Sequence, residues 1–254
     1  MAALYDTIGV DYANLRRPDP RIAAQIDAAL GSARTVLNVG AGAGSYEPAD
    51  REVTAVEPSL EMVRQRPPGA APVVQATAER LPFADASFDA AMAILTVHHW
   101  ADKARGLAEL RRVSRGPVVV LTFDTAHRGN WLTDYLPELI DHNERQMPQM
   151  SDYARGLGAV EITPLPIPHD CSDGFLYAYW RRPRAYLDPP IRAAMSSFWA
   201  IGGAEEGLQR LADDLDSGRW NERYGHLLAL DAIDAGYRLL TTVSSQPSTA
   251  VVGA

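Results

Sequence analysis

Short apolar segments alternate with amphipathic segments along the first half of the chain. Each apolar segment has only four to eight residues, which suits strands buried in a parallel sheet. The predicted strands cover residues 35–39, 53–56, 72–76, 88–95 and 117–123. Helices are predicted between them at residues 60–66 and 103–113. Because such strands and helices are joined by right-handed crossovers, the pattern predicts a doubly wound α/β sheet with helices on both faces.

The second half of the chain is predicted to be mainly helical. Pro164 and Pro166 interrupt one further apolar segment, and because proline cannot donate to a strand ladder, we expect this strand at the edge of the sheet. The predicted order is helices at 132–144 and 151–157, the edge strand at 160–167, an aromatic-rich helical region at 171–236 and a last strand at 237–243. The N-terminus adds predicted helices at 2–15 and 20–30, the second of which ends at Gly31.

The composition is that of an ordinary soluble globular protein, with 46% hydrophobic and 22% charged residues. No apolar run approaches the ~20 residues that span a bilayer, and the N-terminal residues show no secretion signal. The single cysteine, Cys171, cannot form an internal disulfide. We therefore expect a cytoplasmic protein that does not bind membranes. The net charge of −8 opposes contact with a phosphate backbone, so nucleic acid is not an expected partner.

The first predicted strand runs directly into a glycine-rich loop, residues 40–44, with the pattern G-x-G-x-G. Glycines at this spacing allow a sharp turn and let a flat ligand lie against the backbone. Glu57 stands at the end of the second predicted strand, 13 residues beyond Gly44. A carboxylate at that place can accept both hydroxyl hydrogens of a ribose, and ligands of open α/β sheets bind at these carboxyl ends.

The spacing of the glycines separates two kinds of cofactor. Dinucleotide-binding loops have the pattern G-x-G-x-x-G and hold a pyrophosphate at the N-terminus of a following helix. Here the third glycine comes one residue earlier, and Pro48 leaves room for barely one turn of helix before the second strand. Such a helix would be a poor pyrophosphate anchor, whereas S-adenosylmethionine has no phosphate and needs none.

An ordered set of motifs over about residues 34–124 resembles class I S-adenosylmethionine-dependent methyltransferases, in the broad small-molecule group that includes ubiquinone-biosynthesis methyltransferases. The motifs are Val36-Leu-Asn-Val-Gly-Ala-Gly-Ala-Gly44, Val56-Glu-Pro-Ser59, Ala76-Thr-Ala-Glu-Arg-Leu-Pro-Phe83, Ser87-Phe-Asp-Ala90 and Val97-His-His-Trp100. The resemblance implies a seven-stranded, mostly parallel sheet of order 3-2-1-4-5-7-6 whose last strand is antiparallel. Two features depart from the family pattern: Asn38 stands where Asp is commoner, and residues 45–51 are abbreviated.

The resemblance also implies how S-adenosylmethionine, or its product S-adenosylhomocysteine, would be held. Glu57 would take the ribose hydroxyls, Pro58 would pack on the adenine, and the backbone around Leu95 would hold the methionyl group. The other implied cofactor-binding residues are Gly40, Ala41, Gly42 and Gly44 in the loop and Thr77, Ala78 and Glu79 after the third strand.

Residues near the N-terminus could add to this site. Tyr12 could close over the cofactor, because an aromatic face attracts a sulfonium cation, or it could pack in the core. Arg16 and Arg17 could neutralise the methionyl carboxylate, or they could be a solvated pair.

His98 and His99 follow the fourth predicted strand, at the rim where cofactor and acceptor would meet. Histidine titrates near neutrality, so either ring could act as a base or bind the acceptor. Alternatively, the pair caps the strand and bonds to backbone. Methyl transfer is an in-line displacement that depends mainly on alignment and exclusion of water. No metal is predicted, because these histidines and Cys171 lack metal-ligand spacing.

Aromatic side chains after the fifth and sixth strands predict a pocket for an apolar or planar acceptor. The expected substrate-binding residues are Trp131, Tyr135, Asp170, Phe175 and Tyr179. Alternatively, these aromatic residues simply pack the helical region onto the sheet.

Together these features predict an enzyme, a monomer or homodimer, that methylates an O, N or C atom of a small aromatic or apolar metabolite. The alternatives are a non-catalytic S-adenosylmethionine-binding protein and a methyltransferase that acts on protein or RNA. We expect a single domain with four parts. They are an N-terminal helical lid (1–31), a cofactor-binding core (32–170), a helical cap (171–236), and a last strand with a tail (237–254).

Overall fold

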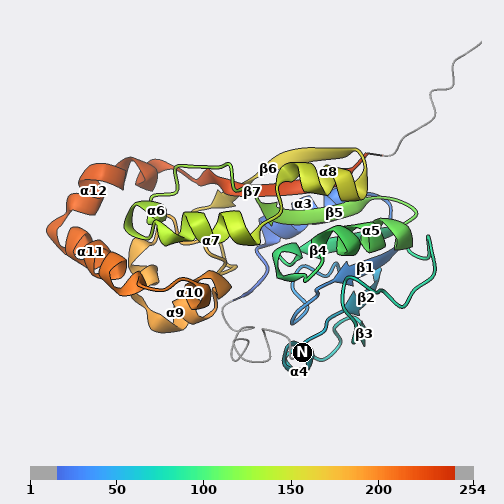
Figure 1. The fold of residues 1–254 in the computed structure, drawn as a ribbon. Helices are drawn as coiled ribbons and strands as arrows, with labels where there is room; N and C mark the ends of the chain where they lie inside the picture. The colour runs from blue at the N-terminus through green and yellow to red at the C-terminus, as the bar shows by residue number, and fades with distance from the viewer. Residues whose placement is uncertain (1–15, 244–254) are drawn as a thin grey trace, which may run out of the picture.

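The computed structural model describes residues 16–243, and its centre is a seven-stranded sheet (Figure 1). The strand order is β3-β2-β1-β4-β5-β7-β6, and β7 runs antiparallel to both of its neighbours. The strands are β1 (Thr35–Val39), β2 (Glu52–Val56), β3 (Val73–Val74), β4 (Ala90–Ile94), β5 (Val118–Phe123), β6 (Val160–Pro168) and β7 (Ala232–Thr242). The prediction of a doubly wound, mostly parallel sheet is confirmed, and the proline-containing β6 lies at its edge.

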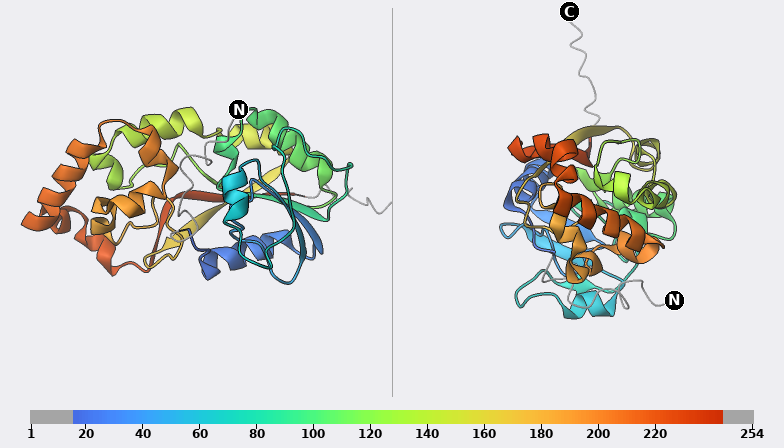
Figure 2. Two further views of the ribbon diagram at one scale, coloured as in Figure 1. Left: turned by 90° about the horizontal axis from the view of Figure 1, so that it is seen from below. Right: turned by 90° about the vertical axis from the view of Figure 1, so that its left-hand side faces the viewer.

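Alternating strand side chains belong to two hydrophobic clusters, one on each face of the sheet. Ala91 and Ala93 of β4 pack in one cluster with residues of α5 (Lys103–Val113) and α8 (Met150–Leu157). Ala90 and Met92 belong to the other cluster, which contains α3 (Pro20–Leu30). Figure 2 shows α3 on one side of the sheet and α5 and α8 on the other. Successive strand residues point to opposite faces, so wholly apolar strands are buried on both sides.

The helix predicted over residues 132–144 is two helices in the structure. α6 (Leu132–Tyr135) ends just before Pro137, and α7 (Glu138–Gln146) begins just after it. Leu136 leaves the helical conformation, with φ −127° and ψ 69°. The reason is steric, because the proline ring disfavours the helical conformation in the residue that precedes it.

The residues between β6 and β7 form a helical cap that lies beyond one end of the sheet, together with α6 and α7 (Figure 1). Its elements are the 3₁₀ helices η2 (Pro183–Leu187) and η3 (Gly225–Ala229) and the helices α9 (Pro189–Ala193), α10 (Ser196–Ala200), α11 (Ala204–Ser217) and α12 (Arg219–Tyr224). The last strand begins at Ala232, five residues before its predicted start, because it pairs with the whole length of β6 from Pro168 onward. No helix within residues 16–243 is long and apolar enough to cross a membrane.

The connection from β1 to β2, residues 40–51, contains turns and no helix. A buried ion pair occupies this region instead. The Arg66 guanidinium, just beyond α4 (Leu60–Arg64), lies 2.8 Å from the Glu47 carboxylate, and the two side chains are only 5% and 9% exposed. Arg66 also donates to the carbonyl oxygens of Gly42 (3.3 Å) and Ala71 (3.0 Å). These contacts attach the glycine loop to the segment after α4.

Asp19 caps α3 and joins the N-terminal segment to the loop after β6. Its buried carboxylate accepts hydrogen bonds from the backbone N–H groups of Arg21 (3.0 Å) and Ser172 (3.1 Å), and it pairs with the Arg21 guanidinium (2.7 Å). Burial by itself raises the pKa of Asp19, but these hydrogen bonds outweigh it and lower that pKa to about 2.

We expect Asp19→Asn to lower the free energy of unfolding at pH 7 by about 2 kcal/mol. A carboxylate whose pKa is depressed in the folded state stabilises the fold above its unfolded pKa, and this stabilisation is lost as the pH falls through the folded value. The difference between the two proteins should therefore shrink between pH 4 and pH 2. Urea unfolding at pH 7 and pH 3 measures it. A difference that does not change with pH would contradict the assignment.

Candidate active site

A cavity of about 320 Å³ opens at the carboxyl ends of β1, β2 and β4. It is lined mainly by the glycine loop, the end of β2, the segment after β3 and the end of β4, and also by Arg16 of the N-terminal segment and Met62 of α4. The predicted cofactor-binding residues that line it are Gly40, Ala41, Gly42, Glu57, Pro58, Thr77, Ala78, Glu79 and Leu95. Gly44 does not line the cavity, and Tyr12 lies outside the described residues. The volume is in the range usual for small-molecule sites.

Glu57 lines this cavity and is 6% exposed. One carboxylate oxygen accepts from the backbone N–H of Gly42 (2.8 Å) and the other from that of Ser59 (2.9 Å). These two backbone bonds fix the orientation of the carboxylate at the cavity.

The glycine loop owes its shape to left-handed backbone conformations and close contacts. Gly40, Gly42 and Gly44 have φ values of 70°, 53° and 96°. A Cβ on Gly40 would overlap the side chain of Thr96, at the end of β4. The loop therefore needs glycine at position 40 for both conformation and space.

We expect Gly40→Ala to destabilise the fold more than Gly69→Ala. Both glycines have positive φ, 70° and 84°, but a Cβ on Gly69 would meet nothing within 4 Å. Both variants should suffer the backbone cost of about 1–2 kcal/mol, and only Gly40→Ala should add about 1–3 kcal/mol of overpacking. Urea unfolding of the two variants gives the difference. Equal destabilisation would contradict the close contact with Thr96.

Glu79 lines the cavity, but its carboxylate also anchors the segment before α5. Its Oε1 accepts from the backbone N–H groups of Ala101 (2.8 Å) and Asp102 (3.2 Å). Burial acts to raise the pKa of Glu79, but hydrogen bonds to backbone and to Thr77 lower it overall. Glu79 thus joins the segment after β3 to the one after β4.

Tyr46 and Arg16, which both line the cavity, bind the same buried carboxylate, that of Asp173, which no motif predicts. Asp173, which is fully buried, accepts from the Tyr46 hydroxyl (2.9 Å) and from the Arg16 Nε (2.5 Å). These partners lie 127 and 157 positions away from it along the chain, so no local pattern could have found the contact. The arrangement connects the glycine loop, the N-terminal segment and the loop after β6.

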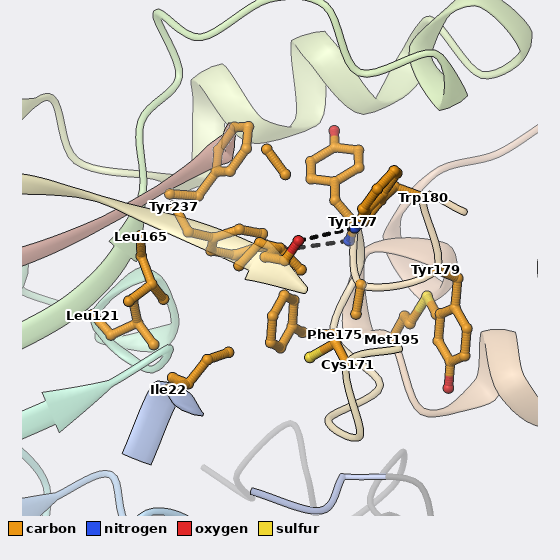
Figure 3. Close-up of a cluster of buried hydrophobic side chains, with 14 of the residues drawn as sticks. Ile22, Leu121, Leu165, Cys171, Phe175, Tyr177, Tyr179, Trp180, Met195 and Tyr237 are labelled. Atoms are coloured by element: carbon orange, nitrogen blue, oxygen red, sulfur yellow. Dashed lines mark hydrogen bonds between the residues drawn. The ribbon is translucent and has the colours of Figure 1, made fainter. Parts of the chain in front are cut away.

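A second cavity, of about 50 Å³, adjoins the first and shares Arg16 and Leu95 with it. Its other walls are mainly aromatic and apolar, and they come from the sheet, the cap and α7. They include His98, Phe123, Asn143, Met147, Phe175, Tyr177, Met195 and Tyr237. Figure 3 shows Phe175, Tyr177 and Tyr237 converging between the sheet and the cap. Leu95, at the junction, has a positive φ of 52°, which is uncommon for a residue other than glycine.

The predicted substrate-binding residues separate into two groups. Phe175 lines the second cavity, whereas the other four do not line either cavity. Trp131 and Tyr135 are buried in an aromatic cluster of the cap, and Tyr179 lies under the guanidinium of Arg182. Asp170 is an exposed partner of Arg21. Trp131 and Tyr135 thus show the aromatic packing that the alternative interpretation describes, and acceptor binding by these five residues stays a prediction.

His98 and His99 lie next to each other but face different cavities. His98 lines the second cavity and His99 the first, and their ring centroids are 3.8 Å apart. Burial is the main cause that lowers both pKa values, and Arg16 and Lys103 add to it. The pKa of His99 falls to about 4, and that of His98 falls well below 6.5. Both rings are therefore neutral at physiological pH. No group of three or more metal-binding side chains occurs within residues 16–243.

Comparison with known proteins agrees with this geometry. A sequence profile of the Methyltransferase domain family matches residues 37–120. A solved structure from Anabaena variabilis, described as a methyltransferase from an antibiotic biosynthesis pathway, is 35% identical to this chain. The alignment covers 91% of this chain and 100% of that one, with a TM-score of 0.84.

Two curated proteins match over a shorter stretch. Malonyl-[acyl-carrier protein] O-methyltransferase of Pseudescherichia vulneris is 40% identical over 120 residues, or 44% of this chain and 45% of that protein. Ubiquinone/menaquinone biosynthesis C-methyltransferase UbiE of Geobacter sp. strain M21 is 31% identical over 113 residues. This stretch is 38% of this chain and 48% of that protein. The chain thus spans about half the length of these curated relatives. The fold, the cavity and these matches show that the chain belongs to the S-adenosylmethionine-dependent methyltransferases.

The residues present fit S-adenosylmethionine, the cofactor of this family. The glycine loop is not followed by a helix that could anchor a phosphate, and this ligand has none. The carboxylate of Glu57 is held in a fixed orientation at the end of β2, where a ribose can meet it. The first cavity is large enough for a nucleoside with its amino-acid arm.

Proposed function

We propose that this chain methylates an O, N or C atom of a small aromatic or apolar metabolite. One observation carries the proposal: a larger cavity, suited to the cofactor, meets a smaller aromatic cavity at Leu95 and Arg16. Bound in the larger cavity, S-adenosylmethionine would supply an electrophilic methyl group. The smaller cavity is where an acceptor would be held against it.

Within the larger cavity we assign the ribose hydroxyls to Glu57 and the adenine to Pro58, Thr77 and Ala78. We assign the backbone at Leu95 to the methionyl group, because Leu95 lines both cavities. Leu95 N–H is already used, since it donates to the Leu121 carbonyl oxygen (2.9 Å). The carbonyl of Leu95 is therefore the group that we assign to the ligand.

The smaller cavity, which we call the acceptor cavity, supports a small substrate by its size and chemistry. Phe123, Phe175 and Tyr237 form an apolar wall, and a cavity of about 50 Å³ admits only a small group. A net charge of −8 gives no general attraction for RNA. The curated relative UbiE is named for ubiquinone/menaquinone biosynthesis, which supports a small acceptor, whereas the other relative is named for a malonyl group carried by a protein.

We assign the role of base to His98, because it faces the acceptor cavity and is neutral at physiological pH. A ring with a strongly lowered pKa is a weak base. It suits an acceptor whose own proton is already acidic, such as a phenol or an enol. The remaining contribution of the chain is to align the reactants and exclude water.

A panel assay tests this proposal. The purified chain would be titrated with S-adenosylhomocysteine in a calorimeter and then incubated with labelled S-adenosylmethionine and phenols, β-dicarbonyls, amines, a protein extract and RNA. We expect binding of the product and label transfer to a small acceptor. Binding without transfer to any small acceptor, but with transfer to protein or RNA, would overturn the acceptor class. Absence of binding would overturn the cofactor site.

A further inference from the structure

Asn38 is the polar side chain that β1 places at the cavity. It is 2% exposed, and it lines the cavity from the strand that leads into the glycine loop. Its Nδ2 donates to Oε1 of Glu47 (3.1 Å). In the described part of the chain no hydrogen bond reaches its Oδ1. The two ends of a carboxamide differ, since one only donates and the other only accepts. Which end faces the cavity therefore matters.

The Glu47–Arg66 ion pair decides the orientation of this carboxamide. The ionised Glu47 carboxylate can only accept, so the Nδ2 end of Asn38 must face it. Both oxygens of Glu47 also accept from one Arg66 nitrogen, at 2.9 and 2.8 Å, which holds the carboxylate in place. Oδ1 of Asn38 is thereby turned away from Glu47.

We infer that Glu47 and Arg66 are positioning residues for the amino-acid arm of the cofactor. They present Oδ1 of Asn38 to the cavity, where it accepts a hydrogen bond from the α-ammonium group of the methionyl moiety. The inference rests on the proposed cofactor site. With the reverse orientation, Asn38 would direct an NH₂ donor at an ammonium donor, and the contact would be repulsive.

The same ion pair explains why an amide serves at position 38, although a carboxylate would be the simpler acceptor. An aspartate is an acceptor at both ends, so it needs no orienting partner. At position 38, however, an aspartate would lie about as close to the Glu47 carboxylate as Nδ2 now does, and like charges at that distance repel. The abbreviated segment that places Glu47 here thus favours asparagine over aspartate.

The experiment replaces the ion pair by apolar residues, as Glu47→Leu with Arg66→Met. A buried ion pair replaced by residues of similar volume often leaves the fold intact, and thermal unfolding would verify this. Two probes are titrated by calorimetry. S-adenosylhomocysteine carries the amino-acid arm, whereas 5′-methylthioadenosine lacks it. We expect the double variant to bind S-adenosylhomocysteine about 10-fold more weakly and 5′-methylthioadenosine within twofold of the unaltered chain, because only the arm meets Asn38.

Adding Asn38→Asp to the double variant should restore S-adenosylhomocysteine binding, since a carboxylate needs no orientation. The same substitution in the unaltered chain should weaken it. Equal losses for both probes would show that the ion pair only shapes the loop and would overturn the inference, as would no loss for either. If the unaltered chain binds neither probe, the cofactor site itself fails, and that outcome is distinct from these.

Discussion

Replacement of Glu57 by alanine is expected to weaken binding of S-adenosylhomocysteine by about 10²–10⁴-fold. The reason is that two ribose hydroxyls would each lose a hydrogen bond to a charged acceptor, and each such bond contributes about 1.5–3 kcal/mol. The carboxylate also organises the site before the ligand arrives, because it accepts from the N–H groups of Gly42 and Ser59. Calorimetric titration of the variant measures the loss.

Glu52→Ala is the matched control for this substitution. Glu52 begins the same strand, β2, but it is exposed at the opposite end of the sheet. Its removal changes the net charge by the same amount as Glu57→Ala and should leave the affinity for S-adenosylhomocysteine unchanged. Unchanged affinity in Glu57→Ala would refute the ribose assignment. An equal loss in both variants would instead indicate a general effect of charge.

Replacement of His98 by glutamine is expected to reduce turnover by about 10²–10⁴-fold while S-adenosylhomocysteine still binds. Glutamine keeps a polar group in the wall of the acceptor cavity but cannot take up a proton at neutral pH. His99→Gln should act differently, because His99 faces the larger cavity. We expect its main effect on the affinity for the cofactor. Steady-state kinetics with the acceptor found in the panel assay separates kcat from KM.

The pH profile gives an independent check of the same assignment. A base must be deprotonated to act, and burial keeps the pKa of His98 well below 6.5. The acid limb of kcat should therefore lie well below pH 6.5, with a plateau above it. His226→Gln, at an exposed position of η3, is the control and should leave the profile unchanged. Full activity of His98→Gln would contradict the assignment, because the acceptor would then lose its proton without His98.

The glycine loop and Glu57 were predictable because their signals are local. A short apolar strand that runs into G-x-G-x-G, with an acid at the end of the next strand, implies two neighbouring strand ends in any parallel sheet. The segment after β3 followed from resemblance alone, and the structure places Thr77 and Ala78 at the same cavity.

The acceptor side was predictable only in part. Trp131, Tyr135 and Phe175 are all aromatic and all follow strands, so the sequence could not tell which of them pack and which line a cavity. The structure places only Phe175 at the second cavity, beside Asn143, which no motif singled out. The difference is decided by how the cap and α7 meet the sheet, and such contacts join residues far apart in the chain.

The amino-acid sequence by itself determined the class of fold and pointed to the glycine loop and Glu57 as a proposed cofactor site, because periodicity, turn geometry and residue type act within a few positions of one another. The strand order followed from the family that its motifs resemble. Only the tertiary structure decided that Asp173 joins Tyr46 to Arg16, that His98 and His99 face different cavities, and that Glu47 orients Asn38. These depend on long-range packing, because a side chain's role there is set by its neighbours in space.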